Sequence, residues 1–105
     1  MVRLALDTGS TSTLINSSIL ERLGYLKQQA TKHVGITTAS QMLYAPLFEI
    51  RQLSVLGIDR KTFAVVSHDL PKSATIDGVV GLDFLRQCKV EIDFSQGSVS
   101  LERMI

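Results

Sequence analysis

The residues best suited to chemistry follow the first apolar segment of the chain, where an aspartate precedes small and hydroxyl-bearing residues. The sequence there is Asp7-Thr8-Gly9-Ser10-Thr11-Ser12-Thr13, directly after the alternating Val2, Leu4 and Leu6. Alternation with a period of two residues predicts a β-strand, and polar loops after strands often carry functional groups. Asp7 is therefore the first candidate for a reactive side chain.

A carboxylate in this position has several possible uses. Asp7, Gly9 and Thr11 match the Asp-x-Gly-x-Thr spacing of phosphate loops of the sugar-kinase and actin type, but those folds need two large lobes, which 105 residues cannot supply. An aspartate after a strand is also a common turn residue. The hydroxyl cluster has no histidine at a plausible partner position, so serine-protease chemistry is not supported. The remaining use is one half of a carboxylate pair that shares a proton and activates water.

A second motif near the C-terminus favours the carboxylate pair. Val79-Val80-Gly81 is followed by Leu82-Asp83-Phe84-Leu85 and later by Ile92-Asp93-Phe94. Together with Asp7-Thr8-Gly9-Ser10, these segments resemble the retropepsin-like aspartic proteases, the single-domain relatives of retroviral protease, over nearly the whole chain from Val2 onward. The resemblance implies an all-β, retropepsin-like acid protease fold that is closed and mainly antiparallel, with a flap hairpin, a psi-shaped loop and one or two short helices.

The resemblance also implies a role for each residue of the first motif. Asp7 would be the catalytic carboxylate, and Thr8 would interlock with the same residue of a second copy. The carbonyl of Gly9 would receive a substrate amide. The Ser10 hydroxyl would donate to the outer oxygen of Asp7, and because such a donor favours the charged carboxylate, we expect activity on the acid side of neutrality.

The remaining implied site residues come from later segments. Val80 and Gly81 would form the psi-shaped strand behind the catalytic loop. A small, polar hairpin tip without glycine would be the flap over bound peptide: Thr38, Ala39, Ser40, Gln41 and Met42. Substrate would lie extended as an added strand, with Leu14, Ile36 and Val80 as candidate pocket walls.

Hydrophobic patterning predicts the elements that must position these groups. Strands are expected at Val34–Thr38, Leu43–Ile50, Leu53–Leu56, Thr62–Val66, Gly78–Gly81, Val90–Phe94 and Val99–Leu101, with turns at Gly57–Arg60 and Ser95–Gly97. A first helix is expected after Leu14-Ile15, with Ser18 and Glu21 at capping-box spacing and Gly24 at its end. A second helix would be capped by Asp83 and continue through Cys88. The predicted class is all-β with two short helices.

Length and charge limit the other classes of function. The 105 residues fit one domain, 1–105, and a formal net charge of +1 indicates neither nucleic acid nor an acidic membrane surface as a partner. The single Cys88 excludes an intrachain disulfide and a cysteine-based metal site, and no signal or membrane-spanning segment is present. The compartment stays unknown. Six residues precede Asp7, whereas relatives generally begin with one or two more strands, so we expect N-terminal strands of a longer protein to be missing.

The charged and polar residues outside these motifs receive structural interpretations. Asp77 is expected in a turn, Asp93 in a strand or turn, and Asp83 at a helix cap. His33 and His68 are expected to face solvent, and Cys88 is expected to be a buried, small apolar residue.

One chain contains one Asp-Thr-Gly, whereas proton sharing needs two carboxylates. The sequence therefore predicts a homodimer that hydrolyses peptide bonds in peptide or protein substrates, using Asp7 from each copy and neither metal nor cofactor. The alternative is a catalytically silent fold of the same kind, used for dimerisation or peptide binding.

Overall fold

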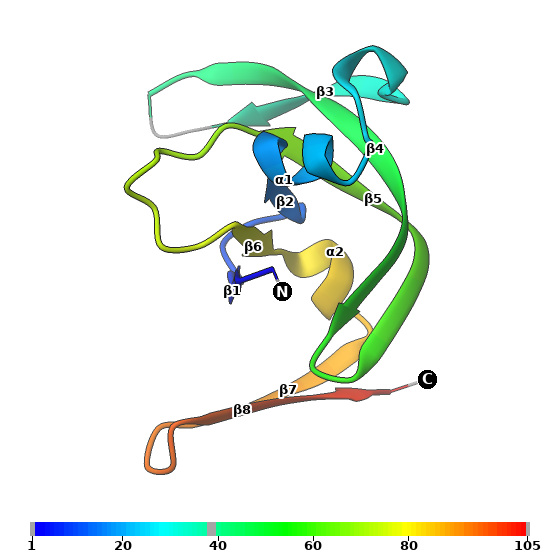
Figure 1. The fold of residues 1–105 in the computed structure, drawn as a ribbon. Helices are drawn as coiled ribbons and strands as arrows, with labels where there is room; N and C mark the ends of the chain where they lie inside the picture. Colours follow the sequence, from blue (N-terminus) through cyan, green and yellow to red (C-terminus); the bar gives the residue numbers. More distant parts are fainter. Residues whose placement is uncertain (1, 38–39, 105) are drawn as a thin grey trace.

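The chain forms one six-stranded sheet and a separate two-stranded hairpin, with short helices between strands (Figure 1). The computed structural model describes residues 2–37 and 40–104. Its strands are β1 (Leu4–Leu6), β2 (Leu14–Asn16), β3 (Lys32–Thr37), β4 (Met42–Val55), β5 (Ile58–His68), β6 (Gly78–Val80), β7 (Cys88–Asp93) and β8 (Ser98–Arg103). Its helices are α1 (Ser17–Arg22), α2 (Leu82–Leu85) and a 3-10 turn over Lys27–Gln29. The predicted all-β class with short helices is confirmed.

The order of strands in the large sheet is β1-β6-β2-β5-β4-β3. Strand β6 lies between β1 and β2, parallel to the first and antiparallel to the second. A late strand inserted between two early ones is the psi-shaped arrangement that the sequence predicts. Strands β3, β4 and β5 form the predicted antiparallel meander, and β2, a strand that the patterning missed, runs parallel to β5.

The meander contains one long strand where the sequence predicts two. The predicted strands Leu43–Ile50 and Leu53–Leu56 are both parts of β4, because Arg51-Gln52 lacks turn-forming residues and the pairing with β5 continues on both sides. The predicted turn at Gly57–Arg60 is also wrong. The turn consists of Leu56 and Gly57, with φ angles of 48° and 87°, and Val55 pairs with Ile58. Two residues of positive φ match the twist of a tight hairpin.

Helix α1 begins two residues earlier than the capping-box pattern indicates. Asn16 is its N-cap, and the Asn16 side chain accepts a hydrogen bond from Ser18 N at 3.4 Å. Ser18 is therefore already inside the first turn, and the predicted Ser18–Glu21 capping box is wrong. The predicted end is confirmed, since Gly24 has a φ of 94° and donates its N–H to the Glu21 carbonyl at 3.0 Å.

Helix α2 is shorter than predicted and is capped differently. It runs from Leu82 to Leu85 with Gly81 at the N-cap position, so Asp83 lies inside the helix and is not its cap. Cys88 is half-buried at the start of β7 and lies outside the helix. The Asp83 carboxylate binds the loop that follows Asp7 and also accepts a hydrogen bond from Phe84 N within the helix.

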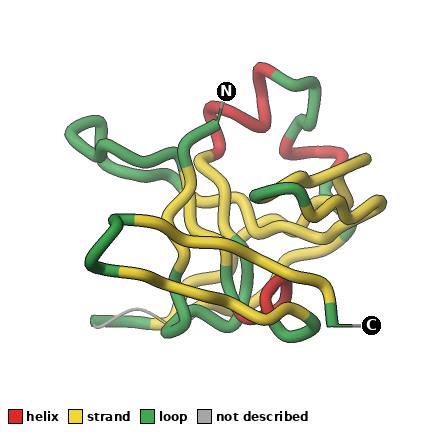
Figure 2. The backbone as a smooth tube through the Cα atoms, turned by 90° about the horizontal axis from the view of Figure 1, so that it is seen from below, coloured by secondary structure: helices red, strands yellow, loops and turns green. Residues whose placement is uncertain are grey.

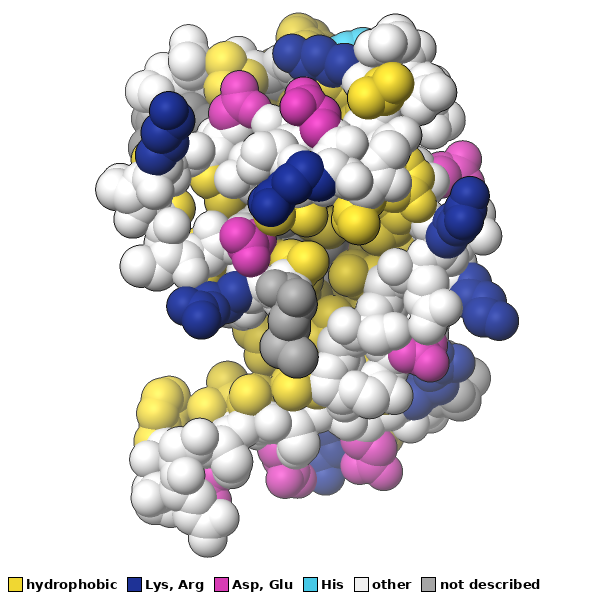
Figure 3. Space-filling model, in the orientation of Figure 1, with side chains coloured by type: hydrophobic (Ala, Val, Ile, Leu, Met, Phe, Trp, Pro, Cys, Tyr) yellow, Lys and Arg dark blue, Asp and Glu magenta, His cyan; other side chains and the backbone are white. Residues whose placement is uncertain are grey.

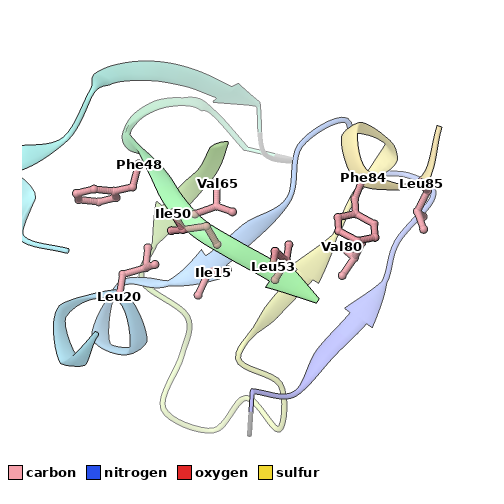
Figure 4. Close-up of a cluster of buried hydrophobic side chains, with 9 residues drawn as sticks. All are labelled: Ile15, Leu20, Phe48, Ile50, Leu53, Val65, Val80, Phe84 and Leu85. Atoms are coloured by element: carbon pink, nitrogen blue, oxygen red, sulfur yellow. The ribbon is translucent and has the colours of Figure 1, made fainter. Parts of the chain in front are cut away.

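A single hydrophobic core joins the sheet to both helices (Figure 4). Its buried members are Ile15, Leu20, Phe48, Ile50, Leu53, Val65, Val80, Phe84 and Leu85. Val80 and Phe84 are fully buried, so Val80 is a core residue and the prediction that it forms a pocket wall is wrong. The Arg60 guanidinium lies 4.8 Å from the centre of the Phe84 ring and donates to the Phe84 carbonyl at 2.6 Å. The core and this contact hold β6 and α2 against the long hairpin.

The described ranges 2–37 and 40–104 contain no helix with the length and apolar character needed to span a bilayer.

Candidate active site

The Asp7 loop begins where β1 ends, and β6 fixes its first residue. Asp7 N donates to the Val80 carbonyl at 3.0 Å, and Ser10 N donates to the Asp7 carbonyl at 3.2 Å, which closes a tight turn. Within that turn Gly9 N donates to Asp7 Oδ1 at 2.9 Å. The half-buried carboxylate is therefore held by its own loop in one orientation.

The junction between β6 and α2 binds the far side of the same loop. Leu82 N donates to the Ser10 carbonyl at 2.8 Å, and Asp83 N donates to the Thr11 carbonyl at 3.2 Å. These hydrogen bonds join backbone groups of the loop to backbone groups about 70 positions later in the sequence. The conformation of the loop therefore depends on the path of that later segment.

Asp83 and Thr13 form a buried polar brace at the end of the loop. Thr13 is fully buried, and both its hydroxyl and its N–H donate to the Asp83 carboxylate, at 2.7 and 2.9 Å. Phe84 N donates to the same carboxylate at 2.8 Å, and Gly81 N donates to Thr13 Oγ1 at 3.2 Å. Sequence reasoning missed this brace, because nothing in the local pattern pairs residues so far apart.

Two glycines allow β6 to approach the loop closely. A Cβ at Gly78 would lie 2.1 Å from the Leu14 carbonyl oxygen, and one at Gly81 would lie 2.6 Å from the Ser12 oxygen. No side chain fits at such distances without displacement of the backbone. The glycines that bracket Val79-Val80 are therefore needed for the insertion of β6 between β1 and β2.

Asp7 faces a cavity of about 570 Å³ between its loop and strand β3. The lining residues are Asp7, Gly9, Ser10, Thr11, Ser12, Leu14, Gly35, Ile36, Thr37, Val66 and His68. Leu14 and Ile36, the two remaining candidate walls, both belong to this set, whereas Val80 does not. The cavity has the position that a substrate cleft over Asp7 would occupy.

The flap residues are described only in part. Thr38 and Ala39 lie outside the described residues. Ser40, Gln41 and Met42 are exposed, and Met42 pairs with Thr37 where β4 begins. None of these three lines the Asp7 cavity, which is bounded on this side by Gly35, Ile36 and Thr37.

Ser10 does not make the contact that the resemblance implies. Its hydroxyl donates to the Ser12 carbonyl at 2.7 Å instead of to an Asp7 oxygen. A serine hydroxyl has one proton to donate, so this bond within the loop excludes donation to Asp7 at the same time. The expected effect of Ser10 on the charge of Asp7 loses its structural basis. Thr8 is exposed beside Asp7, and its contact with a second copy stays a prediction.

The predicted placements of the other charged and polar residues are confirmed only in part. Asp77 joins strand ends, since its carboxylate accepts from Arg3 N at 2.8 Å. Asp93 is the last residue of β7, in agreement with the predicted strand or turn position. Donation by the Ser95 hydroxyl, together with the Gln96 and Ser95 N–H groups, lowers the pKa of the Asp93 carboxyl. His33 is exposed, whereas His68 is half-buried and lines the Asp7 cavity. Sequence reasoning missed His68, because its position at the end of β5 has no local motif.

Across residues 2–37 and 40–104, no three side chains of the His, Cys, Asp and Glu types lie close enough to share a metal ion.

Comparisons with known proteins agree on one class. The sequence model described as aspartyl protease matches residues 1–84, while no curated protein matches the chain in sequence. A retropepsin-like aspartic protease from Rickettsia conorii has a similar structure, with a TM-score of 0.67 and 16% identity, over 96% of this chain and 79% of that one. The retroviral protease-like domain of Ddi1 from Leishmania major gives a TM-score of 0.61 and 17% identity, over 96% and 78%. At such identities the structural likeness shows the fold alone.

Proposed function

The chain belongs to the aspartyl protease family and has a retropepsin-like fold, and from this premise we propose that it is one half of an aspartic endopeptidase with Asp7 as its catalytic carboxylate. The observation that carries the proposal is the position of Asp7, which is half-buried at the end of β1 and faces the cavity of about 570 Å³. The fixed orientation of this carboxylate by Gly9 N supports the same role. A carboxylate held in place beside a cavity can accept a proton from bound water.

The second carboxylate of the pair has to come from another molecule. Among the described residues that line the cavity, Asp7 is the one carboxylate. Two carboxylates that share a site do not ionise together, so one stays protonated and serves as the acid while the other serves as the base. We therefore propose a homodimer in which each copy contributes Asp7.

The proposed reaction is hydrolysis of a peptide bond by water held between the two carboxylates. The ionised Asp7 takes a proton from water while the water oxygen bonds to the substrate carbonyl carbon. The partner's Asp7 gives its proton to the carbonyl oxygen, which forms a neutral tetrahedral intermediate. Asp7, now protonated, then gives its proton to the amide nitrogen while the partner's Asp7 takes a proton from a hydroxyl of the intermediate, so that the carbon–nitrogen bond breaks and a carboxylic acid and an amine are released.

An uncovered apolar surface on the C-terminal hairpin supports dimer formation. Ile92, Phe94 and Val99 are 57%, 92% and 38% exposed. Ile92 pairs with Val99, so the two side chains share one face of the hairpin. The hairpin lies across the underside of the sheet (Figure 2), and hydrophobic side chains line its upper side at a notch in the surface while charged groups lie beneath (Figure 3). A second copy of the chain, bound to this apolar face, would also supply the second carboxylate of the pair.

The proposal is tested by measuring peptide cleavage and molecular mass together. We expect the unaltered chain to cleave members of a peptide library, assayed at several pH values, and to elute as a dimer, with specific activity rising with protein concentration. Asp7→Asn should lower kcat at least about 1000-fold, because it removes the base, while leaving the fold intact. Asp59→Asn, which makes the same chemical change in an exposed side chain outside the cavity, is the matched control.

Equal activity of Asp7→Asn and the unaltered chain would refute the catalytic role. The alternative function, a silent dimerisation or peptide-binding module, predicts a dimer without cleavage. It also predicts little affinity for a transition-state mimic of peptide hydrolysis, because a site without paired carboxylates has little to offer such a compound.

A further inference from the structure

A second cavity adjoins the Asp7 cavity, and His68 lines both of them. The second cavity has a volume of about 360 Å³ and lies between the end of β5, the start of α1 and strands β3 and β4. Its lining includes Lys27, His33, Tyr44 and Asp69 as well as His68. It therefore offers room for a substrate side chain beyond the residues nearest to Asp7.

Groups that can carry positive charge are concentrated in this second cavity. Lys27, His33 and His68 come from three different elements, whereas Asp69 is the one carboxylate among the described lining residues. The Ser17 hydroxyl donates to the Asp69 carboxylate, which occupies part of its capacity to accept. Glu21 lines a smaller neighbouring cavity of about 110 Å³ that shares Lys27 and Asp69, and Asp7 faces His68 from the other side.

Strand β3 connects the two cavities along one edge. Gly35, Ile36 and Thr37 line the Asp7 cavity, and His33, two residues before Gly35, lines the second. Residues two apart in a strand lie about 7 Å from one another. A peptide extended along β3 therefore reaches His33 within about two residues of the part that passes Gly35.

Resting on the proposed function, we propose that Lys27, His33 and His68 form a subsite that binds an acidic side chain of the substrate, a few residues from the bond that is cleaved. A carboxylate of aspartate or glutamate would accept hydrogen bonds from the two imidazoles and the ammonium group. Charged donors of this kind form stronger hydrogen bonds than neutral ones. The preferred substrates are then peptides with an acidic residue at one defined position.

The preference for an acidic substrate side chain should depend on pH, because both the imidazoles and the substrate carboxyl can gain or lose a proton. Imidazoles carry charge more fully in acid, so the preference for glutamate over glutamine increases from about pH 7.5 to about pH 5. It falls again at about pH 3, where the substrate carboxyl is itself protonated. Asp69, Glu21 and Asp7 oppose the effect while they are ionised, and Lys27 supports it throughout.

The subsite is tested by binding, so that the result does not depend on turnover. Peptides that differ by one Glu-to-Gln exchange, at each of about four positions on either side of the central bond, are titrated into the Asp7→Asn protein, which retains every subsite residue. We expect about fivefold tighter binding of the glutamate peptide at one position, at about pH 5. The imidazole signals of His68 and His33 should shift in NMR spectra when that peptide binds.

Substitutions in the subsite should remove the preference without abolishing binding. His68→Gln and His33→Gln should each reduce the ratio of affinities about twofold, and the triple variant that also carries Lys27→Gln should bring it close to one. Lys32→Gln is the matched control, because Lys32 precedes His33 on β3, is exposed and lines neither cavity; it should leave the ratio unchanged.

Two outcomes would overturn the subsite: no position at which glutamate is preferred, or a preference that survives the triple variant of Lys27, His33 and His68. Neither bears on the proposed function, which fails instead when the unaltered chain binds these peptides and cleaves none of them.

Discussion

The Asp7 loop and the β7–β8 hairpin differ in how completely contacts within one chain pair their polar groups and cover their apolar side chains. The loop is held on three sides by bonds within the molecule: to Val80 at its start, to Leu82 along its length and to Asp83 at its end. The hairpin is held to the body near its base, where Arg103 Nη2 donates to the Asp59 carbonyl at 2.8 Å. Toward its turn, its apolar face is uncovered.

This difference indicates which part of the active site one chain can complete alone. Within one chain, hydrogen bonds to Gly9 and Val80 orient Asp7. The exposed hairpin, by contrast, carries apolar surface whose burial is favourable at roughly 25 cal/mol per Å². In the proposed dimer, a second copy would cover apolar surface at the hairpin and would add the second carboxylate at the loop.

The largest expected effect comes from filling the space that β6 needs behind the loop. Gly78→Ala places a Cβ against the Leu14 carbonyl and should lower the free energy of unfolding by about 3 kcal/mol, because the strands must separate. Gly97→Ala in the hairpin is the matched variant. Gly97 has a φ of 64° and open space around it, so its loss should cost about 1 kcal/mol.

Urea unfolding of both glycine variants measures this contrast. Equal destabilisation would mean that the loop is no more tightly constrained than the hairpin, which would contradict the comparison.

Removal of the buried brace should have the next largest effect. Asp83→Ala leaves the fully buried Thr13 without the acceptor of its hydroxyl and N–H, and should lower the free energy of unfolding by about 2 kcal/mol. The same variant should lower kcat of an active dimer, because the loop that orients Asp7 loses its anchor. Thermal unfolding and peptide cleavage are measured on the same sample, and an unaltered stability would show that the brace is dispensable.

Loss of the apolar hairpin face should weaken association without harming the fold of the single copy. Replacing both Ile92 and Phe94 by serine should raise the dimer dissociation constant about tenfold, since both side chains are exposed in one chain and would be buried between two. Analytical ultracentrifugation measures the constant. Lys89→Ser, on the opposite face of the hairpin, is the control, and an equal effect of the two changes would exclude this face as the contact.

The smallest expected effect concerns the hairpin turn and its dependence on pH. Hydrogen bonds from the Ser95 hydroxyl and neighbouring N–H groups lower the pKa of the Asp93 carboxyl in the folded chain. Its contribution to stability is therefore present above the ordinary carboxyl range and is lost as the pH falls below about 4. The difference in unfolding free energy between the unaltered chain and Asp93→Asn should shrink between about pH 6 and about pH 3. A difference that widens in acid would contradict this assignment.

Features set by neighbouring residues could be predicted from the sequence. The strand before Asp7, the end of α1 at Gly24 and the turn between β7 and β8 all depend on residues within a few positions of one another. The psi-shaped path of β6 was predicted through the resemblance and not through periodicity. The strand break at Arg51-Gln52 was predicted wrongly, because the partner strand β5 continues the pairing there.

The candidate site likewise contains one feature that the sequence predicts and several that depend on the fold. Asp7 could be singled out by its motif, whereas the acceptor of the Ser10 hydroxyl, the partner of Asp83 and the place of His68 in the cavity could not. Each of these depends on which groups approach after folding. A hydroxyl or carboxylate binds the best-placed donor or acceptor within reach, and the identity of that group is not encoded by its neighbours in sequence.

By itself the sequence determined the candidate for the reactive group, the number of Asp-Thr-Gly motifs in one chain and the alternating strands, because all three are properties of adjacent residues. The tertiary structure alone decided how that group is held. Thr13 and Asp83 are 70 positions apart, and they meet because glycines let β6 enter between β1 and β2 and because the core fixes α2 behind the loop. Packing brings distant segments together, so their contacts exist only once the whole sheet has formed.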